Sequence, residues 1–231
     1  MYNDVTGIIL SGGKSTRMGT NKSLLKLGDK TVIERIVDLM NPLFGRVILS
    51  TNNFDEYGFL DLEMFEDIYN GFGPIGGIHS GLLHSQTEKN FIISCDIPLI
   101  SAGIIKFLVN YPTNKPITIA KADGFIQQLC GIYSKNVLPE IEKIIKENIT
   151  MDERNRESSL FTTNRHNSLE LEQKKRGCKV LQLVAAVESE IIDIEKEYSS
   201  YVPGTFLNMN NPEEYEQLKN YFSNNPYAKN M

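Results

Sequence analysis

Short apolar runs alternate with helical patterns over the first two thirds of this chain, and this alternation constrains the fold most strongly. Strands are predicted at 5–10, 46–51, 62–65, 91–95, 116–120 and 129–133. Helices are predicted at 31–43, 76–85, 102–110 and 136–148, where apolar residues recur at helical spacing. Strand–helix–strand repeats of this kind predict an α/β fold with a mostly parallel sheet covered on both faces. Such sheets bind ligands outside the carboxyl ends of their strands.

The pattern fails after Ile149. From about 150 to 177 the chain is polar and rich in Arg, Asn, Ser, Glu and Lys. We interpret this stretch as an inserted or mobile segment within a single domain that covers residues 1–231. Order is expected to return at 179–187 and 190–194, and in a last helix that begins near Pro212.

Charge and hydropathy exclude several classes of protein. The chain holds 24 Lys and Arg against 29 Asp and Glu, a net charge of −5 that does not suit a protein coating a nucleic-acid duplex. Its apolar runs are only a few residues long, whereas a membrane-spanning helix needs roughly 20. The amino end lacks the layout of a secretory leader, so a cytoplasmic location is expected. The three cysteines are odd in number and widely spaced, which indicates reduced thiols.

The stretch richest in chemistry spans residues 10–22 and directly follows the first predicted strand. Adjacent glycines, Gly12 and Gly13, let the backbone turn sharply and bring its N–H groups close to an anion. Positive charge follows within a few residues, from Lys14, Arg17 and Lys22. A glycine pair after a strand is often an ordinary turn, but the three cations favour a polyphosphate ligand.

A P-loop is the first alternative for this stretch. Gly13-Lys14-Ser15 resembles its end, but the motif G-x-x-x-x-G-K-[ST] requires glycine at position 8, where the chain has Ile8. The dinucleotide-binding spacing G-x-G-x-x-G is absent as well. Neither of these two phosphate-binding loops therefore accounts for the stretch.

Two further segments carry residues suited to nucleotide chemistry. Residues 73–82 are rich in glycine and follow Asp67, so they allow close approach of a flat ligand such as a base; the alternative is an irregular turn. Asp96 follows an apolar strand and stands before Pro98. At the end of a strand, a carboxylate is placed to hold Mg²⁺ over a triphosphate, although it also suits a turn or a helix cap.

Together these segments resemble the molybdenum cofactor guanylyltransferases, members of the wider nucleotidyltransferase superfamily. The resemblance covers residues 6 to about 148 and resumes near Lys179. Its motifs are Leu10-Ser11-Gly12-Gly13 with Arg17, Met18, Gly19 and Lys22; Gly73-Pro74-Ile75-Gly76-Gly77-Ile78; Cys95-Asp96-Ile97-Pro98; Asp123-Gly124 before Leu129-Cys130-Gly131-Ile132-Tyr133; and Phe206-Leu207-Asn208-Met209-Asn210-Asn211-Pro212-Glu213. The first motif indicates only the superfamily, and the others narrow the match.

The resemblance implies a three-layer α/β/α sandwich of the Rossmann-like nucleotidyltransferase kind, and it assigns roles to individual residues. The implied nucleotide-binding residues are Leu10, Ser11, Gly12, Gly13, Lys22, Asn52, Asp67 and Asp96. The implied catalytic residues are Lys22, Arg17 and Asp96, with Asp96 also the ligand of Mg²⁺. The residues implied near the second substrate are Gly76, Gly77, Asp123, Asn208 and Asn210.

The implied reaction transfers GMP from GTP to the terminal phosphate of molybdopterin and releases pyrophosphate. The acceptor is molybdopterin with or without bound molybdenum. The product is a guanine dinucleotide cofactor. GTP and molybdopterin are the expected small-molecule partners, and proteins that make or accept the molybdenum cofactor are the candidate protein partners. No nucleic acid or membrane partner is expected.

The sequence departs from the family pattern at two positions. Asn21 stands where the family usually has Asp, and Gln128 stands where Pro is expected after Gln127, in the segment thought to meet the pterin. The polar stretch at 150–177 is also longer than expected, and we interpret it as a disordered insert or a cover for the second substrate. Two alternatives stay open: another nucleotidyltransferase, which joins CTP or another NTP to molybdopterin, a phosphosugar or a polyol phosphate, and a non-catalytic nucleotide-binding adaptor.

Overall fold

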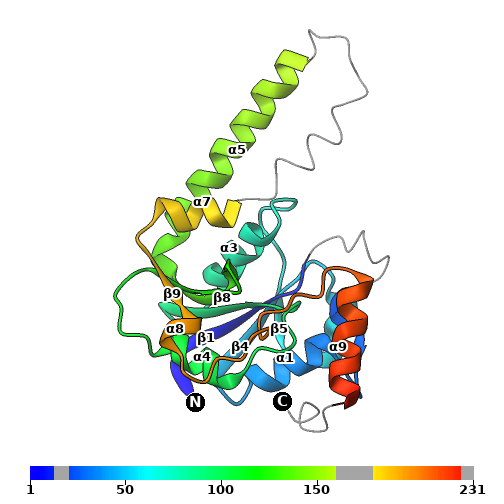
Figure 1. Cartoon of the computed structure of the whole chain (residues 1–231). Coiled ribbons are helices and arrows are strands. Elements are labelled where there is room, and N and C mark those ends of the chain that lie inside the picture. Colours follow the sequence, from blue (N-terminus) through cyan, green and yellow to red (C-terminus); the bar gives the residue numbers. More distant parts are fainter. Residues whose placement is uncertain (13–20, 160–178, 225–231) are drawn as a thin grey trace.

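A seven-stranded sheet forms the centre of the molecule (Figure 1), in a computed structural model that describes residues 1–12, 21–159 and 179–224. The strand order is β5-β4-β1-β6-β8-β7-β9. Its strands are β1 (Tyr2–Leu10), β4 (Phe44–Ser50), β5 (Glu63–Phe65), β6 (Lys89–Ser94), β7 (Ile117–Ala122), β8 (Phe125–Ser134) and β9 (Ser189–Asp193). A separate two-stranded sheet pairs β2 (Lys26–Leu27) with β3 (Lys30–Thr31).

The helices of the described residues surround this sheet. They are α1 (Val32–Met40), α2 (Phe54–Tyr57), α3 (Pro74–His84), α4 (Ala102–Val109), α5 (Leu138–Ser159), α7 (Lys179–Ala186), α8 (Ile194–Glu197) and α9 (Pro212–Asn224). Every strand and helix that the sequence predicts is present within a few residues of its expected bounds, except at the end of α5. No helix in the described part of the chain is both long enough and apolar enough to span a membrane.

The central sheet is mostly parallel, as predicted. Strand β1 pairs in parallel with β4 and β6, β4 with β5, and β7 with β9. Strand β8 runs antiparallel to both β6 and β7. It follows β7 through a two-residue turn in which Asp123 and Gly124 have φ values of 51° and 78°. A turn with two left-handed residues forces the chain straight back, so β8 cannot be a parallel strand.

Two hydrophobic cores cover the two faces of the sheet. One core unites residues of β1, β6 and β7 with helices α1 and α4, and the other unites the same strands with α3, α5 and α7. Neighbouring side chains of a strand point to opposite faces of the sheet, so Ile9 belongs to the first core and Ile8 to the second. Strands buried on both faces have the unbroken apolar runs seen in the sequence. The expected three-layer α/β/α sandwich is confirmed.

Helix α5 is longer than its apolar pattern predicts. The predicted helix ends at 148, but α5 continues to Ser159 and projects beyond the rest of the fold (Figure 1). The added turns contain no glycine or proline, so their helix propensity allows the helix to continue beyond the end of the apolar pattern. Thus the first part of the predicted insert is helical, and residues 160–177 lie outside the described residues. Beyond that gap, β9 returns to the edge of the sheet beside β7.

A small third core attaches α9 to the two-stranded sheet and to the start of α1. Leu27 of β2, Leu218 and Phe222 of α9 are buried together, and the guanidinium of Arg35 lies 4.4 Å from the centre of the Phe222 ring. Arg35 also donates hydrogen bonds to the carbonyl oxygen of Leu27. Met209, which precedes α9, belongs to the same core, and its backbone N–H donates to the carbonyl oxygen of Asp96 just after β6.

Candidate active site

Three adjacent parallel strands end at the same level and define the site. Leu10 at the end of β1 is in register with Ser50 of β4 and Ser94 of β6. Beyond these ends, the backbone N–H of Ser11 donates to Ser50 (3.0 Å), and that of Cys95 donates to the carbonyl oxygen of Leu10 (3.2 Å). The glycine turn and the segment that carries Asp96 are therefore neighbours, although they are far apart in the sequence.

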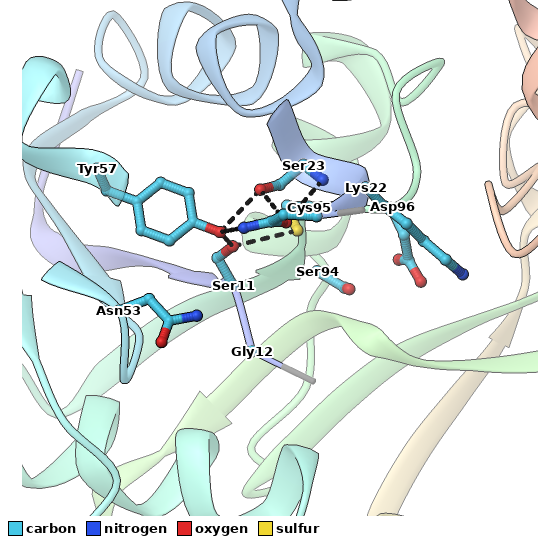
Figure 2. Close-up of a pocket in the computed structure, with 10 residues that line it drawn as sticks. Ser11, Gly12, Lys22, Ser23, Asn53, Tyr57, Ser94, Cys95 and Asp96 are labelled. Atoms are coloured by element: carbon cyan, nitrogen blue, oxygen red, sulfur yellow. Dashed lines mark hydrogen bonds between the residues drawn. The ribbon is translucent and has the colours of Figure 1, made fainter. Parts of the chain in front are cut away.

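A cavity of about 170 Å³, here called the first cavity, opens at these strand ends (Figure 2). The described residues that line it are Ser11, Gly12, Asn21, Lys22, Ser23, Asn53, Tyr57, Ser94, Cys95 and Asp96. Four of the residues predicted to bind nucleotide or metal thus surround one space: Ser11, Gly12, Lys22 and Asp96. Gly13 and Arg17 lie outside the described residues.

The Tyr57 hydroxyl joins the walls of the first cavity, and no sequence motif pointed to it. Ser11 Oγ and Asn21 Nδ2 each donate to this hydroxyl at 2.7 Å, and Ser23 Oγ lies 2.8 Å from it. A phenol oxygen that accepts two hydrogen bonds has its own proton free to donate, and Ser23 receives it. Ser23 in turn donates to Asn21 Oδ1 at 2.8 Å. The buried Tyr57 therefore fixes the residues on both sides of the glycine turn (Figure 2).

This network also explains the asparagine at position 21. Asn21 Nδ2 donates to Tyr57 and also to Glu56 Oε2, at 2.6 Å. An aspartate has no N–H to donate, and its second oxygen would lie beside the Glu56 carboxylate. Like charges at that separation repel. The neutral carboxamide thus suits a site that already has a carboxylate at position 56.

Cys95 belongs to the same network, and its environment is poorly suited to a nucleophile. Its thiol donates to Ser11 Oγ over 3.6 Å. Burial raises the pKa of Cys95 to about 12, and the neighbouring Asp96 carboxylate adds to the rise. A nucleophilic cysteine needs an accessible thiolate, which this environment disfavours.

Lys22 connects the first cavity with the carboxyl-terminal segment. It begins a short 3-10 helix, Lys22–Leu24, whose N-cap Asn21 accepts from the backbone N–H of Ser23. The Lys22 ammonium donates to the carbonyl oxygen of Asn210 at 2.9 Å. The ammonium thus reaches from the glycine turn to a residue that was predicted near the second substrate.

Asp96 is half-buried between Lys22 and the carboxyl-terminal segment. Burial raises its pKa, and the Glu214 carboxylate adds to the rise, whereas the Ser94 hydroxyl and the Lys22 charge oppose it. Its carbonyl oxygen accepts from the backbone N–H of Met209 at 2.9 Å. The part of the chain that the structure describes contains no cluster of three acidic, histidine or cysteine ligands. Because Mg²⁺ at phosphate sites takes only one or two protein carboxylates, Asp96 fits such an ion.

A second cavity, of about 200 Å³, lies on the other side of Asp96. The described residues that line it are Ser94, Asp96, Ile97, Ile126, Gln127, Gln128, Leu129, Cys130, Asn208 and Asn210. Ser94 and Asp96 line both cavities. The structure therefore brings Asn208 and Asn210 to a space that shares Ser94 and Asp96 with the first cavity.

Asn52 and Asp67 form a separate pair at the ends of β4 and β5. Asn52 Nδ2 donates to Asp67 Oδ2 at 3.2 Å, and the backbone N–H of Asp67 donates to Asn52 Oδ1 at 2.8 Å. Burial raises the pKa of Asp67, although hydrogen bonds from Asn52 and Ser50 oppose the rise. Neither residue of the pair is among the described residues that line the two cavities. The pair lies on the β5 side of the glycine turn.

Gly76 and Gly77 lie with that pair rather than with Asn208 and Asn210. A Cβ on Gly76 would meet the carbonyl oxygen of Tyr69 at 2.8 Å, and one on Gly77 would meet Ser50 Oγ at 3.2 Å. Glycine here lets the first turn of α3 pack against the ends of β4 and β5. Neither glycine is among the described residues around the second cavity.

Asp123 has a place in the β7–β8 turn. Its carboxylate accepts from the Tyr201 hydroxyl at 2.9 Å, and its backbone N–H donates to Glu195 Oε1 at 2.7 Å. It is not among the described residues that line either cavity. These contacts give Asp123 a structural role in the turn, where its positive φ is favoured by Asp and Asn.

Comparison with known proteins supports the resemblance found in the sequence. Residues 7–164 match the model of the MobA-like NTP transferase domain. A protein from Carboxydothermus hydrogenoformans named "Probable molybdenum cofactor guanylyltransferase" is 33% identical over 95% of this chain and 98% of its own length. A protein of the same name from Flavobacterium johnsoniae is 34% identical over 93% of this chain and 96% of its own length.

Solved structures share the fold. Molybdopterin-guanine dinucleotide biosynthesis protein A from Archaeoglobus fulgidus superposes with a TM-score of 0.72 at 19% identity, over 96% of this chain and all of that chain (100%). A Mycobacterium tuberculosis structure, solved in complex with manganese, has a TM-score of 0.59 at 15% identity, over 94% of this chain and 99% of that one. The family match and the full-length relatives agree, and this chain belongs to the MobA-like NTP transferase family.

Proposed function

We propose that this chain transfers GMP from GTP to the terminal phosphate of molybdopterin, producing a guanine dinucleotide cofactor and pyrophosphate. The observation that carries the proposal is that two cavities share Ser94 and Asp96 in their walls, and that Lys22, which lines the first cavity, donates to Asn210, which lines the second. A transfer between two substrates requires that their reacting groups meet, so one cavity for each substrate with a shared boundary suits the reaction.

The reaction needs no general base. A phosphate monoester dianion is already a nucleophile, so one of its oxygens forms a bond to the α-phosphorus of GTP. The bond between that phosphorus and the oxygen bridging to the β-phosphate breaks, and pyrophosphate leaves with the electron pair. The protein's task is to align the two substrates and to offset their negative charge.

Residues of the first cavity would do this for GTP. The exposed backbone at Gly12 can approach the phosphates closely, and the Lys22 ammonium lies at the boundary where charge develops. Asp96 would hold Mg²⁺, which supplies positive charge to the phosphate oxygens. Asn52 and Asp67 lie on the β5 side of the glycine turn, where they would contact the base or the ribose.

The test is incubation of the purified chain with Mg²⁺, molybdopterin and each of the four NTPs, with detection of the dinucleotide product by mass. We expect the guanine dinucleotide, with pyrophosphate release, in the GTP reaction only. Product from CTP would identify a cytidylyltransferase instead. GTP binding without any dinucleotide would favour a non-catalytic adaptor and reject the proposal.

A further inference from the structure

Glu56 connects two parts of the wall of the first cavity, although its own side chain is exposed. It belongs to the short helix α2, and its Oε2 accepts hydrogen bonds from Asn21 Nδ2 at 2.6 Å and from Asn53 Nδ2 at 3.4 Å. Both asparagines line the first cavity. Asn53 lies between β4 and α2, whereas Asn21 precedes the 3-10 helix that begins with Lys22. One carboxylate oxygen therefore holds together two segments that are far apart in the sequence.

Asn21 uses all of its hydrogen-bonding capacity in this arrangement. Its Oδ1 accepts from the backbone N–H of Ser23 at 3.1 Å and from Ser23 Oγ at 2.8 Å. Its Nδ2 donates to Tyr57 as well as to Glu56. A carboxamide has two N–H donors and one oxygen with two lone pairs, so none of these groups remains unpaired. Turning the carboxamide over would place Oδ1 against the Glu56 carboxylate, so Glu56 determines which way the Asn21 side chain faces.

The orientation of Asn21 matters for Lys22, because Asn21 is the N-cap of the 3-10 helix Lys22–Leu24. The cap holds the first turn of that helix, and the Lys22 ammonium reaches from this turn to the carbonyl oxygen of Asn210. A side chain that orients the cap thus also orients the ammonium that offsets charge on the GTP phosphates in the proposed reaction.

The charge of Glu56 makes its contacts unexpected at a phosphate site. A carboxylate near a triphosphate repels it, so the charge of Glu56 taken alone weakens nucleotide binding. Its two hydrogen bonds act in the opposite direction, because a wall that is already ordered loses less entropy when a ligand binds. On the basis of the proposed function, we infer that Glu56 is a positioning residue for GTP, which acts through Asn21 on Lys22, and that this effect outweighs the repulsion.

The first test measures the Kd for GTP with Mg²⁺ by isothermal titration calorimetry, without molybdopterin. Glu56→Ala removes both the charge and the acceptor, and we expect the Kd to rise about fivefold, as for the loss of one hydrogen bond. Glu56→Gln removes the charge but keeps an acceptor oxygen for Asn21, so it should recover most of the affinity. If repulsion were the main effect of Glu56, both variants would bind GTP more tightly than the parent chain, and the inference would be overturned.

The second test exchanges the two groups of the Asn21–Glu56 pair. Asn21→Asp places two carboxylates against each other and should raise the Kd for GTP by at least about fivefold. Adding Glu56→Gln restores a donor and an acceptor with the amide on the other side, and the Tyr57 hydroxyl can turn its proton toward the new carboxylate. We expect this double variant to bind GTP within about twofold of the parent chain, because the two substitutions are coupled.

Asn21→Asp combined with Asp55→Asn is the matched control. Asp55 is the exposed carboxylate next to Glu56 on α2, and no hydrogen bond joins it to Asn21 in the described part of the chain. The control has the same net charge as the exchanged pair but not its contact, so it should bind GTP as weakly as Asn21→Asp alone. Equal recovery in both double variants would show a general effect of charge and would exclude the positioning role.

These measurements separate the role of Glu56 from the proposed function. If the parent chain binds GTP but forms no dinucleotide, the proposed function fails and the series of Kd values still tests Glu56. If the parent chain binds another NTP in place of GTP, the proposed function fails as well, and the same series is measured with that NTP. A parent chain that binds no NTP overturns both.

Discussion

The two cavities that meet at Asp96 differ in how their polar groups are paired. Around the first cavity, Ser11, Asn21, Ser23 and Tyr57 satisfy one another through a connected set of hydrogen bonds. Around the second cavity, a buried oxygen of Gln128 has no partner in the described part of the chain. The first cavity therefore keeps its shape before a ligand arrives, whereas the wall of the second contains an unpaired buried acceptor, which costs stability.

Asp96→Ala should have the largest effect, because Asp96 lines both cavities and is the proposed ligand of Mg²⁺. We expect guanylyl transfer to fall at least about 100-fold, as when one group that stabilises developing charge is removed. The dependence of the remaining rate on Mg²⁺ should weaken as well. Initial rates of dinucleotide formation over a Mg²⁺ titration test this. Parent-like turnover would show that the two substrates do not meet at Asp96.

Lys22→Ala should also reduce the rate by at least about 100-fold, through loss of a positive charge at the reacting phosphates. Because Lys22 also donates to Asn210, the variant should raise the KM for molybdopterin as well as that for GTP. Steady-state kinetics in both substrates measure this. Lys26→Ala is the control, since Lys26 is a nearby exposed lysine that lines neither cavity. Equal losses in the two variants would contradict a specific role for Lys22.

Tyr57→Phe should affect the first cavity and leave the second unchanged. It removes the hydroxyl that joins three residues of the first cavity, so the free energy of unfolding should fall by about 1–3 kcal/mol. The KM for GTP should rise several-fold, while the Kd for molybdopterin stays unchanged. Denaturant unfolding and kinetics give both numbers. An altered affinity for molybdopterin alone would refute the separation.

The fold was predictable from the sequence because its signals are local or repeat along the chain. Apolar runs buried on both faces predict the central strands, and Thr31 with Glu34 forms the capping box expected before an amphipathic helix. The end of α5 was missed, since its last turns depend on helix propensity and not on an apolar pattern. The antiparallel direction of β8 had a readable signal, because Asp123-Gly124 between two apolar runs is typical of a hairpin.

The candidate site was predictable only where residues stand directly after strands. Gly12 and Asp96 follow β1 and β6, and neighbouring parallel strands bring their ends together. Tyr57 belongs to α2, a helix of four residues without a recognisable motif. Its role depends on the distance from its hydroxyl to three other side chains, which is set by tertiary packing. The same is true of Gln128 Oε1, whose lack of a partner is not visible in the sequence.

Asp96→Asn should have the smallest effect, and it tests how much the buried carboxylate of Asp96 destabilises the folded protein. Burial raises the pKa of Asp96, so the ionised carboxylate of the apoprotein destabilises the folded state at neutral pH. The neutral asparagine removes that penalty, and an increase in melting temperature of about 2–4 °C at pH 7 would correspond to roughly 1 kcal/mol. The increase should shrink as the pH falls and vanish below the ordinary aspartate pKa of about 3.9, where Asp96 is protonated in both states.

Thermal melting from pH 3 to 8 without Mg²⁺ measures this increase, with Asp55→Asn as an exposed control. An increase that does not change with pH would mean that packing, and not the charge of Asp96, causes the difference, and Asp96 would then resemble the internally satisfied groups of the first cavity.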